Sequence, residues 1–224
     1  MKPIYDIDGI TLYHGDCGEV LPQLKGWADL CLTDPPYGID LDASYSKFKN
    51  ATQYRAVRGD DKAFDAGMLL DIAPKLIVWG GNCFASTLPD FPGWLAWVKT
   101  GRNGAKIRQA EMELAWTNFV TRSQAFRFTW IGAYREGAKL VLAHPTQKPI
   151  QLMRWCLSLA PEAEKIIDPF AGSGTTLVAA KEMGRRAIGI EIDERYCQTI
   201  IQRLGQTEMV FDKSVPAMIS TNCT

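Results

Sequence analysis

Paired cysteines, long apolar runs and an excess of charge of either sign are all missing from this sequence. None of the six cysteines forms a C-x-x-C pair, so a zinc site is not expected. No apolar stretch approaches the ~18 residues that cross a bilayer, and residues 1–20 carry acids and glycines where a secretory signal has its apolar core. The 25 basic residues balance 25 acidic ones. We therefore expect a cytoplasmic protein with free thiols and no membrane segment, in which any nucleic-acid contact depends on a local patch.

Short apolar runs with helical patterns between them are present, and they indicate an α/β fold. The predicted strands are residues 10–13, 29–33, 75–79, 94–98, 113–117, 165–167 and 187–192. Because these runs are apolar throughout, we expect a doubly wound sheet with both faces covered. Helices are predicted at 149–159, 176–183 and 193–204, the last ended by Gly205. Residues 38–66, 99–112 and 118–143 are predicted as loops on the rim of the sheet, and residues 206–224 as a tail.

A strand, a glycine turn and a helix start follow one another at residues 165–176. Gly172 and Gly174 allow close approach of a ligand to the backbone. The lysine of a nucleotide-binding P-loop is absent, and Leu177 replaces the third glycine of a dinucleotide fingerprint. Asp168 at the strand end suits a cationic group, and Glu191 at the end of the next strand suits ribose hydroxyls. The turn thus indicates a nucleoside-like ligand without phosphates, or else is only a tight connection.

The tetrapeptide Asp34-Pro35-Pro36-Tyr37 directly follows an apolar strand. Two prolines fix the backbone and remove two N–H donors, so the Asp34 side chain and nearby carbonyls have little local competition. An exocyclic amine of a nucleobase is a poor nucleophile, and acceptors around its N–H groups expose its lone pair. Tyr37 can then stack on a base that has left the duplex. The other reading is a rigid turn with a surface tyrosine.

Four motifs together resemble those of the DNA amino-methyltransferases that modify adenine N6 or cytosine N4. Their order is similar to that of the permuted (beta-class) branch, in which the catalytic tetrapeptide precedes the cofactor loop. The matching segments are His14-Gly-Asp16-Cys17, Asp34-Pro-Pro-Tyr37, His144-Pro-Thr-Gln-Lys-Pro149 and Asp168-Pro-Phe-Ala-Gly-Ser-Gly174. The resemblance, over about residues 10–204, implies a Rossmann-like S-adenosylmethionine (SAM)-dependent methyltransferase fold. Its sheet would be mixed and seven-stranded, with one antiparallel strand and helices on both faces, and residues 1–205 would form the catalytic domain.

The resemblance also implies roles for individual residues. Asp34, Pro35, Pro36 and Tyr37 would be catalytic. Asp168 and Gly172 would hold the methionine end of SAM, Glu191 its ribose and Asp16 its adenine. Further cofactor contacts are expected from Phe170, Gly174, Thr175 and Lys148. His14 and His144 are interpreted as structural hydrogen-bonding residues, because a lone histidine more often has that role.

A basic segment is the candidate contact to double-stranded DNA. Residues 99–148 hold nine basic and three acidic residues, with aromatic residues between them. The candidate phosphate contacts are Lys99, Arg102, Arg108, Arg122 and Arg127. The target-recognition segment of the family would correspond to residues 118–143, which is short. Sequence recognition is then limited to a short site, is shared with residues 38–66, or requires a homodimer. The other reading is an ordinary solvated face.

Adenine N6 is the favoured target, because the cytosine-N4 branch more often resembles Ser-Pro-Pro-Tyr; cytosine N4 is the alternative. Cytosine C5 chemistry is rejected, because it needs a nucleophilic cysteine, generally one after a proline, and no cysteine here follows a proline. RNA is the less favoured substrate, since nothing resembles an RNA-binding module. A non-catalytic DNA-binding or SAM-binding protein is the reading from a different class. The compact chain is compatible with a solitary or phage-borne enzyme or with a restriction-modification pair.

Overall fold

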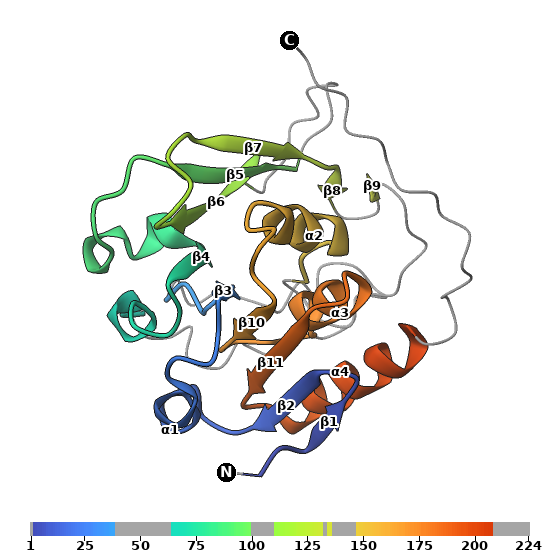
Figure 1. The fold of residues 1–224 in the computed structure, drawn as a ribbon. Coiled ribbons are helices and arrows are strands. Elements are labelled where there is room, and N and C mark those ends of the chain that lie inside the picture. The colour runs from blue at the N-terminus through green and yellow to red at the C-terminus, as the bar shows by residue number, and fades with distance from the viewer. Residues whose placement is uncertain (1, 39–63, 100–109, 132–133, 136–146, 208–224) are drawn as a thin grey trace.

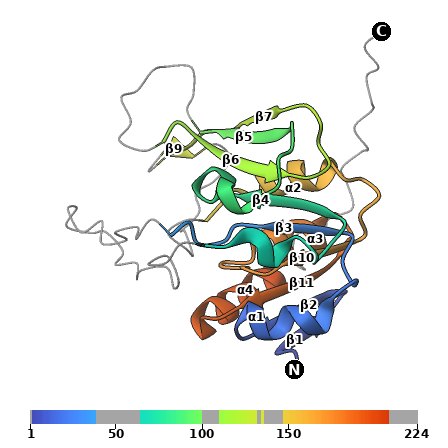
Figure 2. The same ribbon diagram turned by 90° about the vertical axis from the view of Figure 1, so that its left-hand side faces the viewer.

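The computed structural model describes residues 2–38, 64–99, 110–131, 134–135 and 147–207, which are built around one twisted sheet (Figures 1 and 2). The order of its strands is β1-β2-β11-β10-β3-β4-β6-β5-β7. The strands are β1 (Tyr5–Ile7), β2 (Ile10–His14), β3 (Leu30–Thr33), β4 (Lys75–Trp79), β5 (Trp94–Val98), β6 (Met112–Thr117), β7 (Gln124–Arg127), β10 (Lys165–Asp168) and β11 (Arg186–Glu191). A separate two-stranded pairing joins β8 (Trp130–Ile131) and β9 (Tyr134–Arg135).

Helices cover both faces of the sheet. The helices α2 (Ile150–Ser158), α3 (Thr175–Glu182) and α4 (Glu194–Thr207) supply buried residues to one apolar cluster. On the other face, α1 (Cys17–Val20) and the short 3-10 turns Leu21–Leu24, Ala66–Leu69, Gly81–Cys83 and Ala85–Thr87 border a second cluster. The central strands are buried along their length, as β3 is at all four positions, which explains their unbroken apolar sequences. Within the described ranges, no helix combines the length and apolarity that crossing a bilayer requires.

All seven predicted strands are present, and the mixed α/β architecture is confirmed. Among those seven, only β6 runs against the rest, as expected. The strand count was wrong, because β1 and β7 extend the two edges of the sheet to give nine strands. Both added strands are short and mostly exposed, so they lack the apolar run by which buried strands are recognised. Residues 124–127, predicted as loop, are therefore strand.

The predicted helices lie within a residue or two of their observed positions at most ends. The exception is α4, which continues through Gly205 to Thr207, because glycine lowers helix stability without stopping a helix whose apolar face is buried. Ile200 and Leu204 on that face are fully buried. The boundary predicted at residue 205 thus falls inside a helix, and the tail predicted at 206–224 lies otherwise outside the described residues.

The direction of the strands brings distant parts of the chain to one edge of the sheet. Strands β2, β11, β10, β3 and β4 run parallel to their neighbours, so their carboxyl ends lie together. Strand β6 is antiparallel to both β4 and β5, so its amino end lies at the same edge. Residues that follow β2, β11, β10 and β3, and those that begin β6, therefore line one rim. Parallel α/β sheets usually bind ligands at this rim.

Candidate active site

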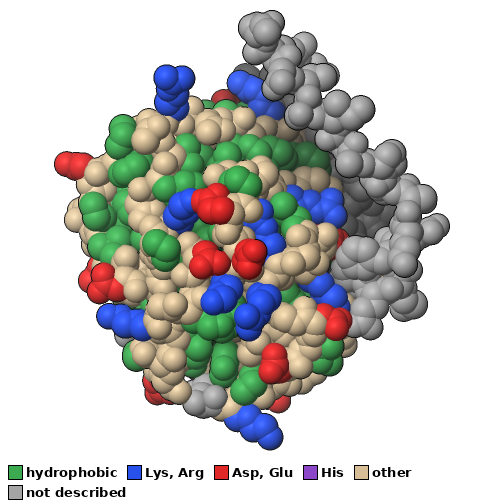
Figure 3. Space-filling view, viewed as in Figure 1, with side chains coloured by type: hydrophobic (Ala, Val, Ile, Leu, Met, Phe, Trp, Pro, Cys, Tyr) green, Lys and Arg blue, Asp and Glu red, His purple; other side chains and the backbone are tan. Residues whose placement is uncertain are grey.

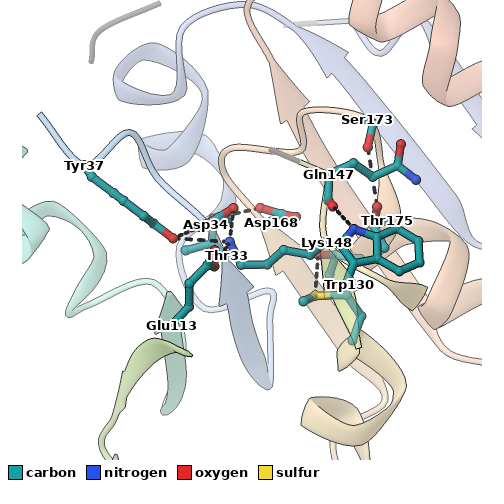
Figure 4. Close-up of polar contacts among 12 residues, drawn as sticks. Thr33, Asp34, Tyr37, Glu113, Trp130, Gln147, Lys148, Asp168, Ser173 and Thr175 are labelled. Atoms are coloured by element: carbon teal, nitrogen blue, oxygen red, sulfur yellow. Dashed lines mark hydrogen bonds and ion pairs between the residues drawn. The ribbon is translucent and has the colours of Figure 1, made fainter. Parts of the chain in front are cut away.

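The Asp34 turn begins where the buried strand β3 ends, and its carboxylate is held on both oxygens (Figure 4). Asp34 Oδ1 accepts a hydrogen bond of 2.7 Å from the Tyr37 hydroxyl, and Asp34 Oδ2 contacts the Lys148 ammonium. Lys148 also donates to the Tyr37 oxygen over 3.2 Å. All peptide bonds of the described turn are trans, and Pro35 is buried. The rigid turn thus presents a half-buried carboxylate whose position is fixed by two partners.

Lys148 reaches the turn from the segment just before α2. Its side chain, 6% exposed, lies between the Asp34 carboxylate and Glu113, with 3.1 Å between Lys148 Nζ and Glu113 Oε2. Glu113 Oε1 contacts the ammonium of Lys99 at the end of β5. The Trp130 indole donates to the Gln147 carbonyl over 3.2 Å, which fixes the backbone beside Lys148. Two lysines and two carboxylates therefore alternate across the ends of four elements, with no net charge.

The pKa values within this network move in different directions. Burial raises the pKa of Asp34 above its ordinary value, although Lys148 opposes the shift. Burial would also raise the pKa of Glu113, but the ammonium groups of Lys148 and Lys99 outweigh it and hold that pKa below its usual range. Lys148, between two carboxylates, has a raised pKa in spite of its burial. Of the two carboxylates, Glu113 is therefore the more firmly ionised.

Tyr37 lies against the backbone of Gly80, the residue that follows β4. A Cβ at Gly80 would lie 2.0 Å from the Tyr37 ring, and Gly80 has a φ of +73°, so glycine is required there on both counts. The ring is only half-buried, and it lines a cavity of about 360 Å³ together with Phe64, Asn82, Cys83 and Phe84. The tyrosine is thus braced on one side and borders open space on another.

The cofactor loop predicted from the glycine turn lies next to the Asp34 turn, because β3 and β10 are neighbouring strands. The Thr33 hydroxyl donates a hydrogen bond of 2.7 Å to Asp168 Oδ1, which joins the two strand ends directly (Figure 4). The same oxygen accepts from the backbone N–H of Phe170 over 3.2 Å. Burial raises the pKa of Asp168 to about 6. The two predicted halves of the site, far apart in the chain, therefore meet.

The two glycines of the turn have different structural roles. Gly174, with a φ of +76°, packs against α4, and a Cβ there would come within 2.8 Å of the Ile200 side chain. Gly172 also has a positive φ of +53°, but a Cβ there would meet only the Phe170 carbonyl oxygen, at 4.0 Å. The interpretation of Gly174 as a point of ligand approach is therefore not favoured by its surroundings, whereas Gly172 faces open space.

Thr175 lies on the helix side of the same turn. Its hydroxyl, which is buried, accepts a 3.2 Å hydrogen bond from Arg203 of α4, and Arg203 also donates to Ser173. Thr175 thus helps to attach the turn to α4. Phe170 is half-buried and makes an edge-to-face contact with Phe64 at 5.3 Å between ring centroids.

Glu191 closes the other side of the turn. Its Oε2 accepts from the Gly172 N–H and its Oε1 from the Asp193 N–H, each over 2.8 Å. The side chain is 8% exposed, and burial raises its pKa to about 7. Asp16 follows β2 beside it and caps α1 by accepting from the Gly18 N–H over 2.7 Å. Each of these carboxylates keeps acceptor capacity for a ligand, since a carboxylate has about four acceptor positions.

Asp168 and Glu191, on the glycine-turn side of the rim, are held by hydroxyl and backbone N–H groups. Within the described residues, neither Asp168 nor Glu191 forms an ion pair. A buried carboxylate without a counter-charge favours a ligand that is cationic or that donates hydrogen bonds. In the same part of the chain, no group of three histidine, cysteine or acidic residues is arranged to hold a metal ion. The donor set therefore fits an organic ligand with an ammonium or sulfonium group and hydroxyls.

Several predicted contacts lie elsewhere than expected. Lys148, predicted beside the cofactor, is instead paired with Asp34 and Glu113. Lys99, predicted on DNA, has a side chain only 13% exposed and is paired with Glu113. Arg127 is exposed at the carboxyl end of β7, on the site's side of the sheet, whereas Arg122 precedes β7 and lies toward the opposite edge.

Other predicted residues cannot be placed. Arg102, Arg108 and His144 lie outside the described residues, as do most of residues 38–66. His14, predicted to be structural, is exposed and its Nε2 lies 3.3 Å from the Ile192 carbonyl oxygen. On the face drawn in Figure 3, basic and acidic side chains are interspersed, without one large patch of either sign.

Three residues of the site were not singled out from the sequence. Glu113 was counted only as an acid within a basic segment, Thr33 only as the end of a strand, and Arg203 not at all. Glu113 carried a usable signal, because a carboxylate inside an otherwise apolar strand needs a buried partner. Thr33 and Arg203 gave no comparable signal, since their partners are more than 25 positions away in the chain.

The chain is similar to known methyltransferases in sequence. Residues 95–203 match the family of DNA methylases that act at N6 or N4 (N6_N4_Mtase). The chain is 39% identical over 95 residues to the type II methyltransferase M2.DpnII of Streptococcus pneumoniae, covering 42% of this chain and 31% of the relative. It is 48% identical over 63 residues to M.HindIII of Haemophilus influenzae, covering 28% and 20%. The matched segments thus span at most about a third of these curated relatives.

Solved structures of methyltransferases share the fold. The M1.HpyAVI–SAM complex aligns with a TM-score of 0.52 at 24% identity, covering 87% of this chain and all of that one. TTHA0409 from Thermus thermophilus, described as a DNA modification methylase, gives 0.55 at 20% identity over 89% and 96% of the two chains. The cytosine-N4-specific PvuII DNA methyltransferase gives 0.60 at 15% identity over 96% and 91%. The chain therefore has the SAM-dependent methyltransferase fold, and its residues 95–203 are related in sequence to the N6/N4 DNA methylases.

Proposed function

We propose that this chain transfers a methyl group from SAM to the exocyclic amino nitrogen of a base in double-stranded DNA, with adenine N6 as the favoured target. The single observation that supports this most strongly is the junction of β3 and β10. There the Thr33–Asp168 hydrogen bond of 2.7 Å sets the Asp34 turn beside the glycine turn. The match to the DNA methylase family over residues 95–203 and the shared fold point to the same chemistry.

The residues of the glycine turn fit SAM. Asp168 and the open side of Gly172 would take the cationic methionine end, Glu191 the ribose hydroxyls and Asp16 the adenine. Within the part of the chain that the structure describes, Asp168 and Glu191 have backbone and hydroxyl partners and form no ion pair with lysine or arginine, so a cationic, hydroxyl-bearing ligand complements them. When bound, SAM supplies an electrophilic methyl group on a sulfonium. Phe170 contacts Phe64, which lines the cavity beside Tyr37.

The Asp34 turn would prepare the nucleophile. Asp34 and the adjacent backbone carbonyl accept hydrogen bonds from the amino group of the base and expose the lone pair on its nitrogen. Pro35 and Pro36 keep the turn rigid, so the base is held in line for the displacement. Tyr37, braced on Gly80 and facing the adjoining cavity, would stack on the flipped base. The amino nitrogen would take the methyl group from the sulfonium, and Asp34 would accept the surplus amino proton.

A label-transfer assay tests the proposal directly. Purified protein is incubated with tritiated SAM and unmethylated duplex DNA, and the DNA is then digested to nucleosides. We expect the label in N6-methyladenine. Label in N4-methylcytosine would retain the reaction and replace the target base. Retention of SAM and DNA binding without any transfer would overturn the proposal in favour of a non-catalytic binding protein. Long-read sequencing of DNA from expressing cells would then report the sequence around the modified base.

A further inference from the structure

Lys148 lies between two carboxylates, and only one of them belongs to the predicted catalytic turn. We propose that Glu113 is a positioning residue that takes over the Lys148 ammonium when Asp34 turns toward the amino group of the base. This inference rests on the proposed function and deepens it, because it assigns to a residue of β6 the control of the carboxylate that activates the nucleophile.

The need for such a residue follows from how Asp34 is held. Its Oδ1 accepts from the Tyr37 hydroxyl over 2.7 Å, and its Oδ2 contacts the Lys148 ammonium (Figure 4). An ammonium in contact draws electron density from a carboxylate and makes it a poorer acceptor for a neutral amine. The base therefore meets a carboxylate that already has a stronger donor. Lys148 has to move aside for Asp34 to serve the amine at full strength.

Glu113 is placed to receive that ammonium. Its Oε2 is already 3.1 Å from Lys148 Nζ, so the exchange needs only a rotation of the lysine side chain. Glu113 stands on β6, which is paired with β4 on one side and β5 on the other. Its second oxygen contacts Lys99, whose ammonium also lies 5.1 Å from the centre of the Trp97 ring. Glu113 is thus an anion held in place by Lys99 and already in contact with the Lys148 ammonium.

The protonation of the two carboxylates suits this exchange. The groups that face Asp34 are Tyr37 of its own turn, Lys148 before α2, Glu113 of β6 and Asp168 of β10. Burial raises the pKa of Asp34, whereas the two lysines hold the pKa of Glu113 below its usual range. When the methylated nitrogen gives up its proton, Asp34 can accept it while Glu113 stays ionised and retains Lys148. The network, neutral before the transfer, then carries one net positive charge, with Lys148 still paired to Glu113.

The test is Glu113→Gln in the full chain, with kcat measured against pH. Without the anion, Lys148 stays on Asp34, and we expect kcat to fall by about tenfold or more while the SAM affinity is unchanged. The Glu113 carboxylate raises the pKa of Asp34, so its removal should also shift the acidic limb of the kcat profile to lower pH. Glu113→Asp should restore part of kcat and move the limb back.

The chain offers a matched control and a variant of opposite sign. Glu182 is a matched control, because its side chain is 19% exposed against 22% for Glu113 and it also forms an ion pair, with Arg154, at the end of α3. Glu182→Gln should leave both kcat and the acidic limb of its pH profile unchanged. In Lys99→Met, Lys148 is the cation that remains beside Glu113, so it should pair more strongly with Glu113 and less with Asp34. The pKa of Asp34 should then rise, and the acidic limb of the kcat profile should move to higher pH. This variant also keeps the test available if Glu113→Gln does not fold.

The results for the wild type and for Glu113→Gln distinguish a failure of the proposed function from a failure of the role proposed for Glu113. Wild-type protein that transfers no label disproves the function. Transfer by the wild type together with an unaltered kcat in Glu113→Gln overturns the inference alone. A lower kcat in Glu113→Gln with no shift of the acidic limb also overturns the inference, because a purely structural role for Glu113 would give that result.

Discussion

On the β3 and β6 side of the rim Asp34 and Glu113 are paired with lysine, whereas on the β10 and β11 side Asp168 and Glu191 are held by hydroxyl and backbone N–H groups. Asp34 and Glu113 share Lys148. Asp168 is bonded to Thr33 and the Phe170 N–H, and Glu191 to two further N–H groups. Carboxylates neutralised by lysine suit an uncharged nucleobase, and carboxylates that form no ion pair within the described residues suit a cationic cofactor. The contrast therefore predicts that a substitution among the lysine-paired residues lowers methyl transfer without weakening SAM binding, and that a substitution beside the glycine turn does the reverse.

The largest effect should come from Asp34→Ala. It removes the carboxylate acceptor that prepares the amine, so we expect transfer to fall by about 1,000-fold or more, as is typical when a preorganised catalytic group is deleted. The SAM affinity should stay close to that of the wild type, because Asp34 belongs to the lysine-paired half. Filter-bound tritium in DNA measures the first quantity and calorimetry the second. Turnover at the wild-type rate would remove Asp34 from the mechanism.

Glu191→Ala is the reciprocal variant on the other half. Loss of its acceptor oxygens should weaken SAM binding by about 2 kcal/mol, or roughly 30-fold, the scale of hydrogen bonds to a charged group. Transfer at saturating SAM should recover most of the wild-type rate. Calorimetry gives the affinity, and a SAM titration of the methylation rate separates KM from kcat. An unchanged affinity would contradict the assignment of Glu191 to the ribose.

The sequence predicted most of this arrangement because the information was local. Apolar runs located the seven inner strands, and the Asp34 turn and glycine turn each follow a strand directly. A strand end fixes the edge of the sheet at which a residue lies, so the meeting of the two turns followed from the alternating strands and helices. Contacts that depend on side-chain direction could not be obtained in this way. Lys148 points to Asp34 rather than to the glycine turn, and the sequence around it gives no sign of that choice.

The two glycines of the cofactor turn provide a structural test within the same half. Gly174→Ala places a Cβ within 2.8 Å of Ile200 at a φ of +76°, and should lower the free energy of unfolding by about 2 kcal/mol. Gly172→Ala carries the strain of a positive φ but meets no close neighbour, so about 1 kcal/mol is expected. Urea denaturation measures both. Equal losses, or a larger loss at Gly172, would contradict the assignment of Gly174 to the packing of α4.

The acidity of the cofactor half predicts how SAM binding depends on pH. Burial raises the pKa of Glu191 to about 7, so this group gains a proton as the pH falls through 7 and loses an acceptor position. If SAM requires the ionised form, its affinity should fall by about tenfold between pH 8 and pH 6. The Glu191→Ala variant should lack most of this dependence. Calorimetric titrations of both proteins across the range measure it, and an equal slope in the two would assign the titration to another group.

The smallest effect should distinguish the two ends of β7. Arg127 is exposed at the end of the strand that shares the site's edge, while Arg122 is exposed near its start. We expect DNA that presents a base to Asp34 to pass over the first end and not the second, so Arg127→Ala should weaken DNA binding a few-fold and reduce the slope of log K against log salt by about 1. Arg122→Ala has the same change of charge and serves as the matched control, with affinity and slope expected to stay near wild type. Fluorescence anisotropy over a series of salt concentrations gives both numbers. Equal losses in the two variants would mean that DNA is attracted by the charge of the whole segment, and that the edge of the sheet does not decide which arginines contact the backbone.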